Sequence, residues 1–164
     1  IALPLSETDA ARALSRAVET VRGVAHDAGA RIEAGPLPDR APALADPDRL
    51  AQVFINLLSN AVKYAGAPAP RIRVSGRIEG GWAVFAVEDD GPGVAEADRE
   101  RIFLKFSRGW DRTDPGGAGL GLAISREIMR RFGGDLVLAE GSALGGARFE
   151  VQLPLLPAPA AAAE

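Results

Sequence analysis

The stretch that most constrains the fold of this chain is DPDRLAQVFINLLSNAVKY, at residues 46–64. Asp46 followed by Pro47 predicts a helix start, because a carboxylate caps the first free N–H groups and proline suits the first helical position. The apolar residues that follow have the spacing of one buried helical face: Leu50, Val53, Phe54, Leu57, Leu58, Ala61 and Val62. The stretch therefore predicts a long helix with one side packed into a core.

A second, polar stripe runs along the same predicted helix. Gln52, Asn56, Asn60 and Lys63 are spaced so that they share one face. A solvated face more often carries Glu, Lys and Arg, whereas amides are mediocre helix formers and good hydrogen-bonding groups. The stripe indicates a lining for a polar ligand. A helix whose polar side simply faces water is the alternative that this stretch alone leaves open.

Composition limits the classes of protein that fit. A chain of 164 residues suits one domain with a sizeable core. The net charge of −3 and the lack of a basic stripe argue against nucleic acid as the main partner. The absence of cysteine excludes disulfides and cysteine-based zinc sites, and no apolar run has the length of a membrane span or a signal peptide. The chain begins at Ile1, and we interpret it as a piece of a longer protein.

The residues on either side of the central helix predict further elements. Apolar spacing predicts a helix over residues 6–28 with Ser6 as its cap, and short strands are expected at 31–34 and 43–45. Clean alternation at 71–78 and 82–88, joined by Glu79-Gly80-Gly81, predicts an antiparallel hairpin.

The last part of the chain completes the predicted domain. A short acidic helix is expected after residue 94, and residues 109–117 have turn composition. A helix is expected over 118–132, with an inward face made of Ile124, Ile128, Met129 and Phe132. Strands at 135–140 and 147–153 follow.

These elements predict an α/β (α+β) two-layer sandwich, in which about three helices pack against a mixed, mainly antiparallel sheet of about five strands. Residues 1–5 are expected to be the end of a preceding segment, 6–155 the domain, and 156–164 a disordered Pro/Ala tail.

Two glycine-rich segments carry further chemistry. Asp89-Asp90-Gly91-Pro92-Gly93-Val94 follows a predicted strand, where a carboxylate can accept a hydrogen bond from an exocyclic amine and glycines let the backbone approach a flat ring. A plain turn is the alternative, because Asp and Gly are common turn residues.

The second segment, residues 116–122, has the sequence GGAGLGL and runs into a predicted helix. Backbone N–H groups at such a helix start suit phosphate, and close helix packing is the alternative. The segment is neither a Walker A loop nor a convincing dinucleotide fingerprint, since no Gly-Lys-Ser/Thr and no βαβ unit accompany it.

Taken together, the segments resemble the catalytic ATP-binding domain of sensor histidine kinases, within the wider superfamily of DNA gyrase, MutL and the large heat-shock chaperones. NLLSNAVKY at 56–64 resembles the N box, DDGPGV at 89–94 the first glycine box, IFLKFSRG at 102–109 the phenylalanine box, and GGAGLGLAI at 116–124 the second glycine box. Their order and spacing match over about residues 6–155. The resemblance implies the Bergerat ATP-binding fold, with ATP and Mg²⁺ as ligands.

The resemblance implies a role for each matching residue. Asn60 is the expected magnesium ligand, and Asn56, Lys63 and Arg108 form the expected catalytic set around the phosphates. Asp89 is expected to read the adenine amine. The other expected nucleotide-binding positions are Tyr64, Gly91, Gly93, Phe103, Phe106, Gly117, Gly119, Leu120, Gly121 and Leu122.

Some of these roles have simpler alternatives. Phe103 and Phe106, expected to anchor a lid over 109–117, also suit a core position, and Arg108 also suits the surface. Ala118 stands where many relatives carry threonine, so a contact between a hydroxyl and a phosphate is missing there.

Asn56 separates two mechanisms. In the ATP-hydrolysing relatives a glutamate stands four residues before the metal asparagine and activates water. An amide cannot accept a proton at neutral pH, so we expect slow hydrolysis and transfer of the γ-phosphoryl group to another nucleophile. The only histidine, His26, lacks the acidic and Arg-x-Pro-Leu-like context of a phosphoacceptor, and we expect that acceptor upstream of Ile1.

The resemblance also implies partners. These are upstream dimerisation and phosphoacceptor helices and a downstream response regulator receiver domain, with no nucleic acid and no membrane contact by this piece. The piece is expected to be monomeric and cytoplasmic, and its parent homodimeric. An anti-sigma-factor serine kinase of the same superfamily and a degenerate regulatory module are the rival interpretations.

Overall fold

The computed structural model describes residues 4–66, 68–104 and 121–157. Along the chain its elements are β1 (Ser6–Asp9), α1 (Ala10–Asp27), β2 (Arg31–Ala34), β3 (Pro42–Ala45), α2 (Pro47–Tyr64), β4 (Arg71–Glu79), β5 (Trp82–Asp89), the short 3₁₀ helices η1 (Glu96–Asp98) and η2 (Arg101–Phe103), α3 (Gly121–Arg131), β6 (Asp135–Ala139) and β7 (Arg148–Pro154).

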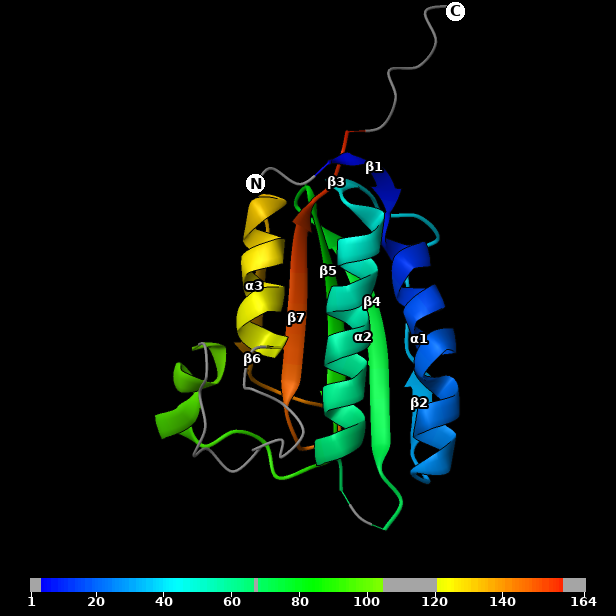
Figure 1. Ribbon diagram of the computed structural model, residues 1–164, viewed down its shortest axis with the longest axis vertical. Helices are drawn as coiled ribbons and strands as arrows, with labels where there is room; N and C mark the ends of the chain where they lie inside the picture. The colour runs from blue at the N-terminus through cyan, green and yellow to red at the C-terminus, as the bar shows by residue number, and fades with distance from the viewer. Residues whose placement is uncertain (1–3, 67, 105–120, 158–164) are drawn as a thin grey trace, which may run out of the picture.

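The main sheet has five strands in the order β2-β4-β5-β7-β6, with β2 and β4 parallel and the other neighbours antiparallel. Helices α1, α2 and α3 lie side by side on one face of it (Figure 1). The predicted two-layer sandwich with a mixed, mainly antiparallel sheet is therefore confirmed. A separate two-stranded sheet of β1 and β3 lies at one end of the helical layer.

The start of the first helix differs from the prediction. Residues 6–9 form strand β1, which pairs antiparallel with β3, and the helix begins at Ala10. Asp9, not Ser6, is the cap: its Oδ1 accepts from the N–H groups of Ala11 and Ala41 at 3.1 and 3.0 Å. The prediction of a cap at Ser6 was wrong because the partner strand lies more than 30 residues away, where no local pattern shows it.

The central helix matches its prediction. Asp46 caps α2 by accepting from the Asp48 N–H at 3.1 Å, and Pro47 occupies the first helical position. All seven predicted apolar residues of this helix are buried. In the turn between β4 and β5, Gly80 and Gly81 both have positive φ, as a tight two-residue turn requires.

The predicted inward face of the last helix needs one correction. Met129 and Phe132 are buried, but Ile124 is 41% exposed. The fully buried residue of this turn is Ser125, whose hydroxyl lies against α2. The burial of a polar residue on this face could not be expected from hydrophobic spacing.

Three further predictions concern short segments of the chain. The expected acidic helix after residue 94 is present as the short 3₁₀ helices η1 and η2. Leu156, placed in the expected tail, donates its N–H to Pro42 O at 2.8 Å and so is still tied to the domain. Residues 109–117, 118–120 and 158–164 of the predicted loop, helix start and tail lie outside the described residues.

Candidate functional site

The polar stripe of α2 faces α3 at its middle. Gln52 donates to Asn56 Oδ1 at 3.0 Å, and Asn56 Nδ2 donates to the buried Ser125 Oγ of α3 at 3.2 Å. Both ends of the Asn56 amide are thus occupied. This excludes the bland interpretation of the stripe as a face turned entirely to water.

Asn60 lies one turn further along α2 and is left incomplete. Its Nδ2 is buried and has no hydrogen-bond partner among the residues that the structure describes. A buried amide without a partner costs free energy, so this position fits a side chain that is completed by a ligand. Rotation of the Asn60 amide by 180° exchanges its nitrogen and oxygen. The oxygen then occupies this position, and an amide oxygen suits Mg²⁺.

The first glycine segment builds a turn at the end of β5. Asp89 is buried, and its Oδ1 accepts from the N–H groups of Gly91 at 2.9 Å and Ala147 at 3.3 Å. Its backbone also pairs with the chain just before β7, since Asp89 N–H donates to Ala147 O at 3.0 Å. The carboxylate is therefore held in one orientation from two sides.

This turn is pressed against the end of α2. A Cβ added at Gly91 would lie 2.0 Å from the Tyr64 carbonyl oxygen, so no larger residue fits there without a backbone shift. Asp90 reinforces the junction, because its Oδ1 accepts from the N–H groups of Gly66 at 2.7 Å and Arg71 at 3.1 Å. The end of the amide stripe and the Asp89 turn thus form one continuous surface.

Gly146 is a site residue that the sequence analysis missed. A Cβ at this position would lie 2.4 Å from both the backbone oxygen and Oδ1 of Asp89, and 2.7 Å from the Gly91 nitrogen. Gly93 has φ +74°, and a Cβ added there would lie 3.8 Å from the Gly146 backbone. The doubled Gly145-Gly146 before a predicted strand was the available signal, but its partner Asp89 is remote in the sequence.

Helix α3 brings its first turn to the same place. Helices α2 and α3 run in opposite directions (Figure 1), and Asn56 bonds to Ser125. Asn60 and Gly121 each lie four residues from this bond toward the same end of the two helices, about 6 Å along each axis. Gly121 begins α3 with no described atom within 4 Å of an added Cβ, whereas the Leu122 side chain is in the core. Backbone N–H groups at such a helix start suit a phosphate.

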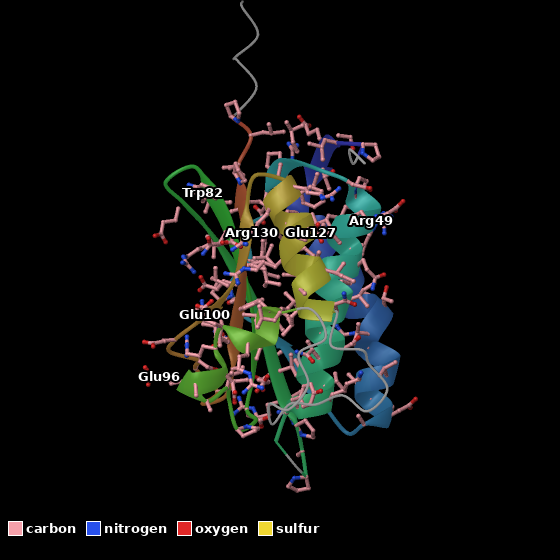
Figure 2. All side chains as sticks on the ribbon, turned by 60° about the vertical axis from the view of Figure 1, so that its left-hand side comes forward. Arg49, Trp82, Glu96, Glu100, Glu127 and Arg130 are labelled. Carbon is pink, nitrogen blue, oxygen red and sulfur yellow. The ribbon has the colours of Figure 1, made fainter. Side chains whose placement is uncertain are left out.

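Phe103 lies on the other side of α3. Its ring meets Phe149 edge-on at 6.3 Å, and the Arg126 guanidinium lies 4.2 Å from its centroid. It lines a groove of about 620 Å³ between η2 and the outward side of α3, where Figure 2 labels Glu127 and Arg130. These contacts anchor η2 to α3, and no described contact joins Phe103 to the amide stripe.

Asp135 holds the far end of α3 to β6. Burial raises the pKa of Asp135, but the Leu136 N–H at 2.8 Å and the guanidinium groups of Arg130 and Arg126 at 3.1 and 3.3 Å outweigh it. The net result is a pKa below the ordinary value of an aspartate. The same Arg126 that stacks on Phe103 is thus fixed by a carboxylate.

The remaining predicted site residues divide in two groups. Lys63 is exposed and Tyr64 half-buried at the end of α2, beside the Asp89 turn. The others lie outside the described residues: Phe106, Arg108, Gly117, Gly119 and Leu120.

None of the helices within residues 4–66, 68–104 and 121–157 is long and apolar enough to cross a membrane. In the same ranges, His, Asp and Glu side chains form no group of three that could hold a metal ion.

Known proteins resemble this chain in sequence. The family model of histidine kinase-, DNA gyrase B- and HSP90-like ATPases matches residues 45–157. The phytochrome-like protein Cph1 of Synechocystis sp. is 36% identical over 152 residues, which cover 92% of this chain and 20% of that protein. The sensor protein RstB of Escherichia coli is 39% identical over 156 residues, covering 93% of this chain and 34% of RstB.

One solved structure resembles this chain in both fold and sequence. Full-length ShkA in complex with AMPPNP superposes with a TM-score of 0.79 at 33% identity, over 98% of this chain and 33% of that one. The chain spans only about a fifth to a third of the length of these relatives. With the family model matched over most of its length, the chain belongs to the histidine kinase-, DNA gyrase B- and HSP90-like ATPases, as a catalytic ATP-binding domain of the sensor histidine kinase type.

Proposed function

We propose that this domain binds Mg–ATP and donates the γ-phosphoryl group to a histidine on a separate dimerisation and phosphoacceptor segment. The observation that supports it most is the meeting of the incomplete Asn60 amide, the Asp89 turn and the first turn of α3 at one end of the molecule. A polyanion with an adenine at one end requires these groups side by side.

In this proposal each side chain has a physical task. Asp89 accepts a hydrogen bond from the adenine amine, and Gly91 and Gly93 keep the backbone close to the ring. Asn60, supported by Asn56, holds Mg²⁺, which supplies charge neutralisation between the phosphates. Lys63 contacts phosphate and Tyr64 the sugar side, while Arg108 and the backbone of Gly117, Gly119, Leu120, Gly121 and Leu122 surround the phosphates.

The Asn56 hydrogen bonds support transfer over hydrolysis. Its oxygen accepts from Gln52 and its nitrogen donates to Ser125, so both amide groups are engaged in structural hydrogen bonds. Hydrolysing relatives carry a general base at this position. Without a base to activate water, the γ-phosphoryl group is held for another nucleophile, and catalysis rests on positioning and charge neutralisation. The aspartate of a response regulator receives the group from the histidine afterwards, in the cytoplasm, with the parent protein acting as a homodimer.

The test is calorimetric titration of Mg–ATP into the wild type and Asp89→Asn. Since Oδ1 of Asp89 already accepts two backbone N–H groups, the substituted amide keeps its oxygen there and turns its NH₂ toward the adenine amine. Loss of a hydrogen bond to a charged group weakens binding roughly 10–100-fold. Asp39→Asn, an exposed carboxylate on the β2–β3 connection, is the matched control and should bind as the wild type does.

Phosphotransfer is measured by adding a phosphoacceptor helix pair to the domain with labelled ATP. Label on the acceptor histidine supports the proposal. Equal affinity of wild type and Asp89→Asn would count against the adenine assignment, and bound nucleotide without any transfer would count against the kinase reaction.

A further inference from the structure

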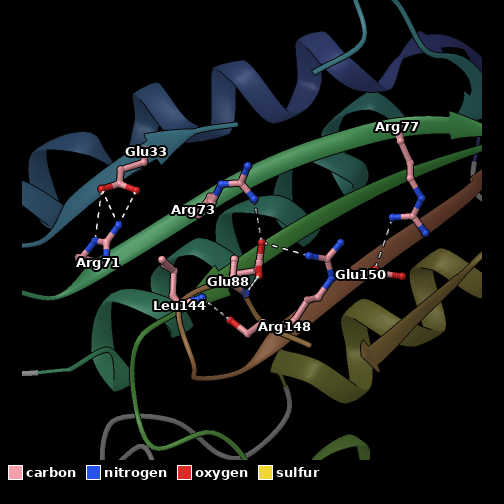
Figure 3. A network of polar contacts seen from close by, with 10 residues as sticks. Glu33, Arg71, Arg73, Arg77, Glu88, Leu144, Arg148 and Glu150 are labelled. Carbon is pink, nitrogen blue, oxygen red and sulfur yellow. Dashed lines mark hydrogen bonds and ion pairs between the residues drawn. The ribbon is translucent and has the colours of Figure 1, made fainter. Parts of the chain in front are cut away.

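The face of the main sheet that the helices do not cover carries an ion-paired network. Figure 3 shows Glu88, the residue before Asp89, between Arg73 of β4 and Arg148 of β7. The nitrogen–oxygen distances to Glu88 Oε2 are 3.5 Å for Arg73 and 3.1 Å for Arg148. The side chain of Glu88 is completely buried, which is unusual for a carboxylate on an outer sheet face.

The loop that joins β6 to β7 is bonded to Glu88. Glu88 Oε1 accepts from the Ala143 N–H at 2.7 Å, a short charge-assisted hydrogen bond. Oε2 has no aligned hydrogen bond among the described residues and is compensated by the two guanidinium charges alone. A buried carboxylate held in this way is costly unless its partners stay in place, so it ties the loop to β5.

The same loop reaches Asp89 from its other end. Gly146 donates its N–H to Asp89 O at 3.1 Å, and Ala147 donates to Asp89 Oδ1 at 3.3 Å. Glu88 and Asp89 point to opposite sides of the sheet because they are neighbours in one strand. One loop therefore wraps the end of β5 and bonds to a carboxylate on each face.

We infer that Glu88 is a positioning residue for adenine recognition: by holding Ala143, it keeps Gly146 and Ala147 against the Asp89 carboxylate and fixes the oxygen that the adenine amine meets. This inference rests on the proposed function. It predicts that loss of the Glu88 anchor lowers the discrimination for the 6-amino group and does not merely weaken nucleotide binding in general.

The experiment compares the dissociation constants of Mg–ATP and of the Mg complex of purine riboside triphosphate, which lacks the 6-amino group. In the wild type ATP should bind about tenfold tighter or more, the size of one charge-assisted hydrogen bond. In Glu88→Ala the ratio should fall toward that of Asp89→Asn, and amide exchange at Gly146 and Ala147 should speed up. Glu88→Gln, whose carbonyl oxygen can still accept from Ala143, should recover most of the ratio.

The matched control is Glu33→Ala, which removes the Arg71 ion pair of 3.1 Å on the same sheet face; among the described residues Glu33 has no hydrogen bond or ion pair to the loop. Its nucleotide ratio should equal that of the wild type. If Glu88→Ala does not fold, Ala143→Pro removes the donor from the loop side and leaves the carboxylate with its arginines, and it should lower the ratio too.

The outcomes separate the two proposals. A wild type that does not distinguish the two nucleotides would contradict the proposed recognition of the adenine amine by Asp89 itself. A wild type that distinguishes them, with Asp89→Asn impaired and Glu88→Ala and Ala143→Pro unimpaired, would overturn only the positioning role of Glu88. A parallel loss of affinity for both nucleotides at constant ratio would overturn it as well, because that is the result of a merely structural residue.

Discussion

The two sides of the candidate site are built in opposite ways. At the Asp89 turn, backbone meets backbone: positions 91 and 146 have no room for a Cβ, and the carboxylate has backbone donors on two sides. Along α2 the site is made of side chains, and the Asn60 nitrogen is unsatisfied among the described residues. The first side is complete without a ligand, whereas in the proposed function the bound nucleotide completes the second.

The difference has a physical reason. Recognition of a flat ring needs a surface of fixed shape, which close backbone packing supplies without any loss of side-chain freedom on binding. Binding of a hydrated ion and a triphosphate needs polar groups that are short of partners, and these cost stability until the ligand arrives. Substitutions on the two sides should therefore separate stability from affinity.

The largest expected effect is that of Gly91→Ala. The added Cβ would lie 2.0 Å from the Tyr64 carbonyl oxygen, so the turn must move away from α2. Overpacking against backbone should lower the free energy of unfolding by about 3 kcal/mol, measured by urea denaturation, and affinity for Mg–ATP should fall with it.

Its control is Gly23→Ala on α1, where no atom of the described residues lies within 4 Å of the added Cβ. That variant should be more stable than the wild type by up to about 1 kcal/mol, because alanine is the better helix former. An unfolding free energy of Gly91→Ala within about 0.5 kcal/mol of the wild type would show that the turn is not rigid.

Asn60→Ala should lower the affinity for Mg–ATP without lowering stability. Its buried amide nitrogen has no described hydrogen bond to lose, and its removal relieves the cost of an unpaired buried group, so the unfolding free energy should stay the same or rise by about 1 kcal/mol. The affinity for Mg–ATP should fall by about tenfold or more, and the dependence of ATP binding on Mg²⁺ should weaken. Arg49→Ala, an exposed position on the same helix (Figure 2), should change neither quantity. A loss of stability at unchanged affinity would make Asn60 a structural residue.

The smallest effect is expected at Asp135, remote from both sides. Its pKa is lowered in the folded state, so it contributes stability above the unfolded pKa of about 4, and that contribution is lost as the pH falls through the folded value. Asp135→Asn should therefore be less stable than the wild type by about 1 kcal/mol at pH 7 and equally stable near pH 2. Glu19→Gln, in an exposed pair with Arg22, should show no such dependence. A difference that stays constant with pH would mean that the charge of Asp135 is not its source.

Much of the site could be predicted because its residues belong to segments with strong local patterns. The amide stripe follows from helical spacing, and Asp89 with its glycines follows from a strand that ends in a turn. The roles of Gly146, Asp90 and Glu88 could not be predicted in the same way, since each depends on a partner in another segment. Ile124 and Ser125 show the same limit: which side of α3 is buried depends on the α2 amides that it meets.

The sequence by itself determined the local elements of this protein: the capped α2, the hairpin of β4 and β5, and the glycine turns. These depend on hydrogen bonds and side-chain spacing within a few residues. Only the tertiary structure decided that residues 6–9 form a strand, that α3 turns Ser125 toward Asn56, and that one loop holds the carboxylates of Glu88 and Asp89 from opposite faces. Those outcomes depend on contacts between segments 30 or more residues apart, where packing and burial outweigh local preference.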